Sequence, residues 1–266
     1  MTVSELMKAV FLKFTDRWFA KWPAPAPGPE RLRHARIISH RGEHDNIRIF
    51  ENTLAAFDAA DRAGVWGIEL DIQWTRDFEP VVIHDIDALR VFRSPIRIHE
   101  TSLSELRSLL PAVPSLAEVI ERYGRRRHLM IELKPETLPR PHTQFQILKR
   151  LTGPLTPQRD FHFLSLVSET FTKIDFVPQG TCILVAEVNI RKQSDLALKK
   201  GFGGFAGHYA LITRKRLARH HRQGQQVGTG FIYSRRCLYR EINRGVDWVF
   251  SNRAVKLQEY CGNDQK

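Results

Sequence analysis

Short apolar runs alternate with amphipathic stretches along most of the chain. Each run holds five to seven residues rich in Val, Ile, Leu and Phe, as buried β-strands do. The predicted strands cover residues 35–39, 66–72, 80–84, 128–133, 161–166, 181–185, 226–232 and 247–251. Apolar residues at three- and four-residue steps predict helices between most of them, at 54–63, 115–123, 143–151, 168–176, 195–200, 213–222 and 236–244. Such repetition indicates an α/β protein with parallel strands joined by crossover helices.

The number of these units favours a closed barrel over an open sheet. Seven or eight strand–helix units in about 230 residues match a TIM (β/α)8 barrel, which is the predicted fold. The alternative is a doubly wound open sheet. No G-x-G-x-x-G or G-x-x-x-x-G-K-[ST] turn follows a predicted strand, and this argues against nucleotide binding in the manner of such sheets.

The first 34 residues have a different pattern. Residues 1–22 predict an amphipathic basic helix, because apolar side chains recur at helical steps with Lys and Arg between them. Such a helix either lies on anionic lipid or packs against the body of the protein or a second copy. The apolar run at 9–12 is broken by Lys13 and Asp16, so it is neither a signal sequence nor a membrane span. A Pro-rich linker is predicted over 23–34, and the barrel over 35–260 with an insertion at about 85–114.

Composition and charge narrow the possible partners. The chain is 42% hydrophobic and 26% charged, which excludes a disordered or collagen-like protein. It carries 41 Lys and Arg against 29 Asp and Glu, and residues 196–240 contain no acidic residue. This excess predicts a phosphate substrate, an acidic membrane surface or nucleic acid as partner, unless it is only a solvated basic face. Three cysteines without a C-x-x-C pair favour a reducing compartment.

Polar residues collect where the predicted strands end. His40 and Arg41 follow the first strand, and His84 ends the third. Glu69 and Asp71 are two residues apart on one strand, so their side chains share a face. Glu132 and Lys134 repeat that spacing on a later strand. Because reacting groups of a parallel barrel lie at the carboxyl ends of its strands, these residues are expected at one rim.

The grouped side chains indicate a metal and a phosphate. A lone histidine at a strand end is usually structural, and an E-x-D pair can simply pair with Arg or Lys. Four strand ends with complementary groups are harder to explain in that way. Three buried carboxylates need a compensating cation, and oxygen ligands without thiolates favour Mg²⁺ or Ca²⁺ over zinc.

Four motifs in order resemble the glycerophosphodiester phosphodiesterase family. The family pattern is H-R-G, E-N-T-x-x-A-F, G-x-E-x-D and V-x-x-H-D. The chain has HRG at 40–42, ENTLAAF at 51–57, GIELD at 67–71 and VVIHD at 81–85. Later segments, IELK at 131–134 and GVD at 245–247, also fit, so the similarity covers about residues 35–255.

The resemblance implies a TIM barrel with an excursion after the second motif strand, and it implies roles for individual residues. His40 and His84 would be the acid–base pair, and Arg41 and Lys134 the phosphate contacts. Glu69, Asp71 and Glu132 would hold the metal, with Glu51 in support, orienting Arg41 or approaching the metal. The chain departs from the pattern at Phe50, at SNRA over 251–254 in place of T-D-R-P, and in having no tryptophan near 227–233.

The predicted function is metal-dependent hydrolysis of a glycerophosphodiester to sn-glycerol 3-phosphate and an alcohol. Two alternatives stand beside it: lysophospholipase D-type cleavage of a lipid-like diester, and a non-catalytic barrel that binds anionic ligands or membranes. The nucleophile, water or the glycerol 2-hydroxyl, is left open, as is which histidine is the acid. The expected location is the cytoplasm, with peripheral contact of 1–22 with the inner face of an anionic membrane under the lipid interpretation. No nucleic-acid partner is expected, and the sequence leaves the oligomeric state open.

Overall fold

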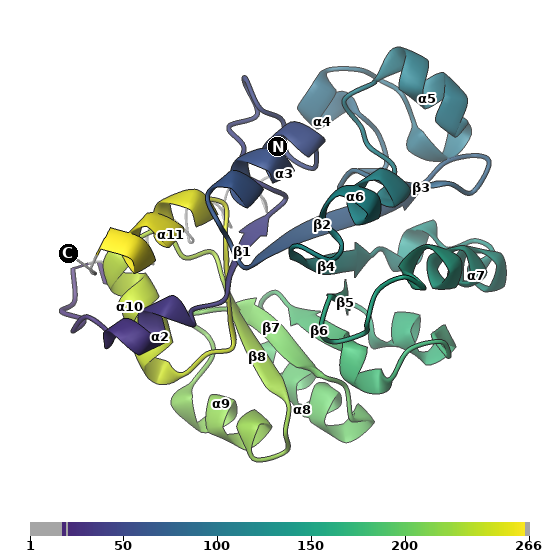
Figure 1. The fold of residues 1–266 in the computed structure, drawn as a ribbon. Coiled ribbons are helices and arrows are strands. Elements are labelled where there is room, and N and C mark those ends of the chain that lie inside the picture. The colour runs from purple at the N-terminus through teal and green to yellow at the C-terminus, as the bar shows by residue number, and fades with distance from the viewer. Residues whose placement is uncertain (1–17, 20, 264–266) are drawn as a thin grey trace.

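Eight parallel strands close into a barrel surrounded by helices (Figure 1). The computed structural model describes residues 18, 19 and 21–263. The barrel strands are β1 (Ile37–His40), β2 (Gly67–Trp74), β4 (His128–Leu133), β5 (Phe161–Ser165), β6 (Cys182–Ala186), β7 (Gly204–His208), β8 (Gln226–Gly230) and β9 (Trp248–Ser251). Each pairs with its neighbour in parallel, and the β1–β2 and β1–β9 pairings close the ring. The predicted TIM barrel is therefore confirmed.

The outer helices follow the strands in the predicted order. They are α3 (Leu54–Arg62), α6 (Leu116–Tyr123), α7 (Pro141–Thr152), α8 (Ile190–Lys200), α9 (Arg214–His221), α10 (Arg235–Arg244) and α11 (Ala254–Asn263), with a 3-10 helix at Ser168–Lys173 where an α-helix was predicted. The largest apolar cluster packs between strands and helices, and a smaller one fills the barrel around Trp248 and Met130. Cys182, Cys237 and Cys261 are buried and form no disulfide.

Two strand assignments from the sequence are wrong. Residues 80–84 were expected to be a barrel strand, but β3 (Pro80–Val82) pairs antiparallel with the end of β2 and lies outside the ring. The link between β2 and β3 is far too short for a parallel crossover, which needs a dozen residues or more. The strand that completes the ring of eight is instead β7, which the apolar pattern did not predict. Its sequence, GFAGH, is rich in glycine because a Cβ on Gly204 would lie 1.8 Å from the carbonyl oxygen of Gln226.

The excursion between β2 and α6 forms a small lobe beside the barrel. It contains β3, α4 (Leu89–Phe92), a 3-10 turn at Ile98–Glu100 and α5 (Leu103–Leu109). Its own apolar cluster includes Val81, Ile83 and Leu106. The lobe lies at the upper right of Figure 1, next to β2 and α6. It carries residues 83–90 to the edge of the barrel, where they bear on the site described below.

The predicted N-terminal helix lies largely outside the described residues. Of its described part, Phe19 packs edge-on against Tyr209, with the Arg240 guanidinium 4.1 Å from the Phe19 ring centre. The predicted spacer at 23–34 is extended only in its first half, because α2 (Pro29–Arg33) follows and buries Leu32. None of the described helices combines the length and apolar character that crossing a membrane requires.

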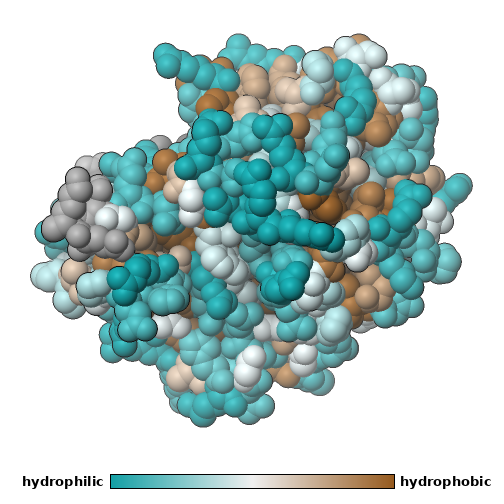
Figure 2. Space-filling view, viewed as in Figure 1, coloured by the Kyte–Doolittle hydropathy of each residue, from teal (hydrophilic) through white to brown (hydrophobic). Residues whose placement is uncertain are grey.

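The face toward the viewer in Figure 1 is the floor of the barrel, where the strands begin. Successive elements run clockwise in that view, as right-handed crossovers require when seen from this end. Figure 2 shows hydrophilic side chains over the middle of this face. The residues that precede β1, β4 and β5 at this end line a hollow of about 310 Å³, whose lining includes Arg33, Arg125, Arg126, Arg127 and Arg159. Several of these arginines pair with Asp61 or Asp160.

Candidate active site

The predicted site residues converge at the opposite end, the mouth of the barrel. A cavity of about 240 Å³ opens there. Its polar wall is formed by His40, Arg41, Glu69, His84, Glu132 and Lys134. Asp71 lies directly behind this wall, in contact with Arg41 and Lys134. The structure thus brings together seven side chains that span nearly a hundred positions of sequence.

Three carboxylates form the centre of the site. In the β2–β4 pairing Asp71 lies opposite Glu132, and Glu69 is two residues before Asp71 on the same face. One oxygen of each carboxylate lies within 4.8 Å of the others, and all three residues are buried. Burial and the charges of Asp71 and Glu132 raise the pKa of Glu69 well above its usual value. Burial and Asp71 likewise raise the pKa of Glu132.

Two cations neutralise Asp71 from opposite sides. The Nε of Arg41 lies 3.0 Å from one oxygen of Asp71, and the Nζ of Lys134 lies 2.7 Å from the other. Lys134 also contacts Glu132. Although burial opposes ionisation, these two cations hold the pKa of Asp71 well below its usual value. The three carboxylates therefore differ in their tendency to hold a proton: the pKa of Asp71 is lowered, and those of Glu69 and Glu132 are raised.

The E-N-T motif builds the loop that supports Arg41. Glu51 accepts a hydrogen bond from Nη1 of Arg41 at 2.9 Å and pairs with Arg90 at 2.7 Å. Asn52 has a left-handed backbone (φ 57°), and its amide donates to Asp71 at 3.0 Å. Thr53 caps the N-terminus of α3 by accepting from the backbone of the first turn. Of the two places considered for Glu51, the structure puts it beside Arg41.

His40 stands at the end of β1 with a neutral partner. Its Nδ1 lies 2.5 Å from Oδ1 of Asn252, while the amide nitrogen of Asn252 donates to the Tyr233 hydroxyl. An amide oxygen only accepts, so Nδ1 carries the proton and Nε2 offers its lone pair to the site. Nε2 lies 3.8 Å from Glu69. Burial, together with the charge of Arg41, lowers the pKa of His40 to about 3.

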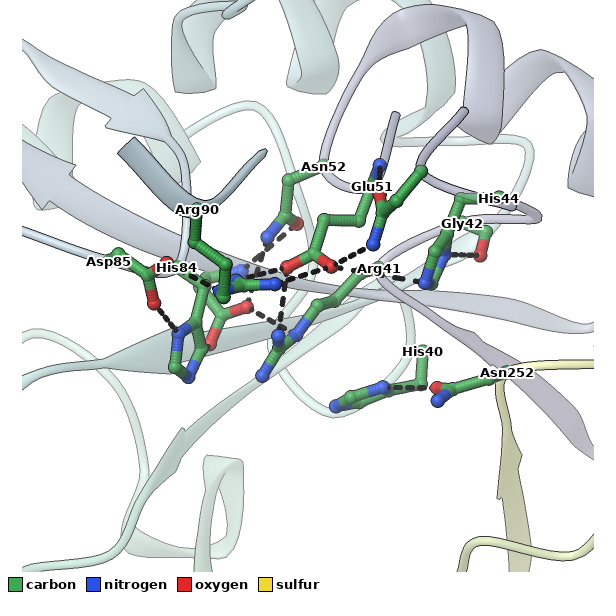
Figure 3. Close-up of polar contacts among 12 residues, drawn as sticks. His40, Arg41, Gly42, His44, Glu51, Asn52, His84, Asp85, Arg90 and Asn252 are labelled. Carbon is green, nitrogen blue, oxygen red and sulfur yellow. Dashed lines mark hydrogen bonds and ion pairs between the residues drawn. The ribbon is translucent and has the colours of Figure 1, made fainter. Parts of the chain in front are cut away.

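His84 stands across the cavity with an anionic partner. Its Nδ1 donates to Asp85 at 2.6 Å, and the other oxygen of Asp85 accepts from Nε of Arg90. Its Nε2 points inward and lies 4.0 Å from Asp71. His84 reaches this place although β3 is not a barrel strand, because β3 folds back on β2 and the backbone of Ile83 bonds to that of Asp71. Figure 3 shows both imidazoles with their partners.

Three contributors to the site were missed in the sequence. The sequence indicates Asn252 only as a departure from the family pattern, and Arg90 belongs to none of the motifs. The third is a largely apolar wall that faces the polar one, formed by Leu164, Leu166, Val185, Val188, Leu211, Phe231 and Phe250, with Glu187 and His208 as further polar residues of the lining. The position of Asn252 just after the last strand was the available signal. Arg90 lies in the excursion, whose path the strand pattern does not determine.

The donor set fits a divalent cation. Three buried carboxylates within reach of a common centre are ligands that Mg²⁺ and Ca²⁺ prefer. Burial and the neighbouring carboxylate charges raise the pKa of Glu69 and of Glu132. A bound cation would compensate this concentration of buried negative charge. Among the described residues, this is the one such group of His, Cys, Asp and Glu side chains.

Comparison with known proteins agrees with this geometry. The model of the glycerophosphoryl diester phosphodiesterase family matches residues 40–255. A glycerophosphodiester phosphodiesterase of Caldanaerobacter subterraneus is 33% identical over 127 residues, or 43% of this chain and 51% of the relative. One from Bacillus altitudinis is 28% identical over 84% of this chain and 98% of the relative. The chain thus spans about half the length of the first of these relatives and nearly all of the second.

Solved structures share the fold. A glycerophosphodiester phosphodiesterase from Thermotoga maritima superposes with a TM-score of 0.71 at 22% identity, covering 85% of this chain and 98% of that one. A phosphodiesterase from Oleispira antarctica, solved with the product sn-glycerol-3-phosphate, gives a TM-score of 0.70 at 23% identity over 86% and 98%. With its barrel, its four ordered motifs and a family match over most of its length, this chain belongs to the glycerophosphoryl diester phosphodiesterase family.

Proposed function

We propose that the protein hydrolyses a glycerophosphodiester to sn-glycerol 3-phosphate and an alcohol with the aid of a divalent cation. The observation that carries this proposal is the pair of inward-facing imidazoles on either side of a three-carboxylate centre. The product bound in the Oleispira antarctica phosphodiesterase, together with family membership, supports the choice of substrate.

The two histidines have opposite roles because their partners differ. His40, with a neutral amide on Nδ1 and a pKa of about 3, is unprotonated at neutral pH and accepts the proton of the attacking hydroxyl at Nε2. The Nδ1 of His84 donates to the Asp85 carboxylate, which fixes the ring with Nε2 toward the cavity and across from His40. His84 therefore donates a proton from Nε2 to the leaving alcohol oxygen. Each proton transfer is worth about 10²–10⁴-fold in rate.

Arg41 and Lys134 would hold the phosphate. Both line the cavity and carry their charge on its polar wall. Glu51 and Asp71 fix the Arg41 guanidinium from two sides, so little side-chain freedom is lost when an anion binds. Glu69, Asp71 and Glu132 would hold the cation, which when bound supplies further neutralisation of the diester charge.

Metal removal tests the proposal first. We expect EDTA to abolish release of sn-glycerol 3-phosphate from glycerophosphocholine, and excess Mg²⁺ or Ca²⁺ to restore it. A preparation treated with EDTA already saturated with Mg²⁺ is the control for chelator effects. Full activity after dialysis against EDTA would contradict the metal assignment.

Substitution of the histidines tests the rest. His40→Ala and His84→Ala should each lose at least about 10²-fold in kcat while the unfolding midpoint changes little, since neither side chain is part of the apolar core. His34→Ala is the control, because His34 is exposed, precedes β1 at the other end of the barrel, and contacts the backbone carbonyl of Glu30 through its Nδ1. A variant at 40 or 84 with normal turnover would remove that residue from the mechanism.

A further inference from the structure

Exposed apolar side chains gather around the mouth of the barrel. Among the described residues, eight large apolar side chains are exposed. Four of these lie on loops that follow β1, β3, β5 and β6, and a fifth begins α4, just after β3. These five, here called the apolar rim, are Ile47, Ile86, Leu89, Val167 and Val188. Ile47 and Val188 are each 80% exposed. Scattered exposed apolar residues need no explanation, but a ring of them around one opening does.

The same end of the barrel carries exposed cations in an unusual place. Helices of a parallel barrel begin at the mouth, and the positive end of the helix dipole favours acidic residues in the first turn. The helices α8, α9 and α10 have no acidic residue there. They begin instead with cations: Arg191 and Lys192 on α8, Arg214 and Lys215 on α9, and Arg235 and Arg236 on α10. These six residues are called the basic rim.

Two of these cations have partners within the chain: Arg235 lies over the rings of Tyr239 and Tyr260, and Arg236 donates to the backbone carbonyl of Lys21. The helix dipole does not explain the four cations of α8 and α9, so these four point to an outside partner.

Acidic residues lie at this end as well, in the segments that follow β1, β3, β4, β5 and β6: Asp45, Asp87, Glu136, Glu169 and Glu187. The six cations are concentrated instead on α8, α9 and α10, which follow β6, β7 and β8. A surface that combines exposed apolar side chains with several cations is complementary to an anionic membrane, where apolar groups enter the interface and cations meet lipid phosphates.

The cavity is continuous with this surface and is apolar on one side. Val188 belongs both to the apolar rim and to the cavity wall. Below it lie Val185 and Leu211, and Phe231 sits with its ring centre 5.3 Å from that of His40. Phe231 has a left-handed backbone (φ 61°), a conformation that costs energy for a bulky residue and recurs at functional sites.

We propose that the mouth docks on an anionic membrane and takes a single-chain glycerophospholipid, whose acyl chain lies along the apolar wall. The inference rests on the proposed function and specifies its substrate class. One chain fits the arrangement because the wall opposite is formed by charged and imidazole side chains. A second acyl chain would have to lie against those groups.

The reaction is an ordinary hydrolysis. Water adds to phosphorus and gives its proton to His40, and the bond between phosphorus and the head-group oxygen breaks. The head-group alcohol leaves with a proton from His84. The products are an acylglycerol phosphate and the alcohol, with no oxidant or reductant needed.

Vesicle binding tests the docking surface without reference to turnover. The protein should co-sediment with vesicles of phosphatidylglycerol and phosphatidylcholine, and less with phosphatidylcholine alone. Arg191→Gln/Lys192→Gln/Arg214→Gln/Lys215→Gln should bind at least about tenfold more weakly, since each cation near an anionic surface contributes about fivefold. Ile47→Ser/Ile86→Ser/Leu89→Ser should also bind more weakly. Both variants should keep the wild-type kcat/KM for soluble glycerophosphocholine.

Two matched controls define the orientation. Lys199→Gln/Lys200→Gln removes two cations at the floor end of α8, and Leu109→Ser removes an exposed apolar residue from α5. Both should bind vesicles as the wild type does. Loss of binding in these controls, with binding kept in the rim variants, would overturn the proposal that the mouth faces the membrane.

Substrate comparison tests the lipid itself. With metal present, the wild type should release choline from lysophosphatidylcholine in these vesicles as well as from glycerophosphocholine. Leu211→Ser should lower the kcat/KM for lysophosphatidylcholine relative to the kcat/KM for glycerophosphocholine. Hydrolysis of glycerophosphocholine with none of lysophosphatidylcholine would overturn this inference and leave the proposed function standing. Hydrolysis of neither would overturn both.

Discussion

The two histidines of the site differ in one atom of their partners. The Nδ1 of His40 donates to an amide oxygen of Asn252, and the Nδ1 of His84 donates to a carboxylate oxygen of Asp85. A charged carboxylate and a neutral amide act differently on the imidazole that they contact. In the proposed mechanism these two partners, rather than the histidines themselves, distinguish the acid from the base.

Changing Asn252 to Asp should remove that difference. Asn252→Asp puts a negative charge beside His40 and should raise its pKa by about one unit or more from about 3. Because His40 must be unprotonated to act as base, the acidic limb of kcat/KM should move to higher pH, with little change above pH 8. Tyr233→Phe is the control, because it removes only the hydroxyl that accepts from the Asn252 amide. An unmoved acidic limb would show that His40 is not the base.

At the scale of elements, the turn from β1 to α3 depends on a glycine. Gly42 has φ +77°, and a Cβ there would lie 2.6 Å from Cβ of Ala56 in α3. The close approach of this turn to α3 allows Arg41 to face the site while the loop continues to Glu51.

Two glycine substitutions separate backbone strain from collision. Gly64 has a similar φ of +75°, but a Cβ there would meet nothing within 4 Å beyond its own chain neighbours. Gly64→Ala should lose about 1 kcal/mol of unfolding free energy through its backbone conformation alone. Gly42→Ala should lose about 3 kcal/mol, because strain and overpacking add. Urea unfolding of both variants measures this, and equal losses would contradict the contact argument.

At the scale of the whole molecule, buried imidazoles link stability to pH. His128 and His162 lie inside the floor of the barrel, with Nε2 of His128 and Nδ1 of His162 2.7 Å apart. Burial lowers the pKa of His128 to about 4 and that of His162 well below its usual value. The unfolded chain, with imidazoles near about 6.5, therefore binds protons that the folded protein does not.

This linkage predicts that the free energy of unfolding decreases as the pH falls below about 6.5. The contribution of His128 to this decrease ends near pH 4, where the folded protein also binds the proton. Each such histidine contributes a slope of at most about 1.4 kcal/mol per pH unit. His128→Gln should reduce the slope of unfolding free energy between pH 7 and pH 5, whatever it does to absolute stability at pH 7. The same slope in both proteins would mean that His128 is not the titrating group.

The two ends of the barrel also divide the charge of the chain. At the floor, arginines pair with Asp61 and Asp160 beneath a hydrophilic face (Figure 2). At the mouth, the basic rim lies beside exposed apolar residues. The stretch without acidic residues at 196–240 therefore does not form one uniform face, because its strands and helices distribute it between both ends.

Local periodicity was enough to predict the barrel and most of the polar wall. Side chains two apart on a strand share a face whatever the partner strand is, so Glu69 and Asp71 could be placed together from sequence alone. The same reasoning failed where the result depended on the direction in which a strand runs. His84 was placed at the rim correctly, but on a parallel strand that is in fact the antiparallel β3. The short link to β2 contained that information.

What the sequence by itself determined is the alternation of strands and helices and the residue types at strand ends, because both follow from spacing over a few residues. Only the tertiary structure decided the partners across the barrel. Closure pairs Ser39 of β1 with Ser251 of β9, which brings Asn252 to His40 across more than two hundred residues. The lobe brings Arg90 to Glu51, and five different strands or the segments that follow them, β5 to β9, supply the apolar wall. Such contacts depend on ring closure and packing, which no short window of sequence contains.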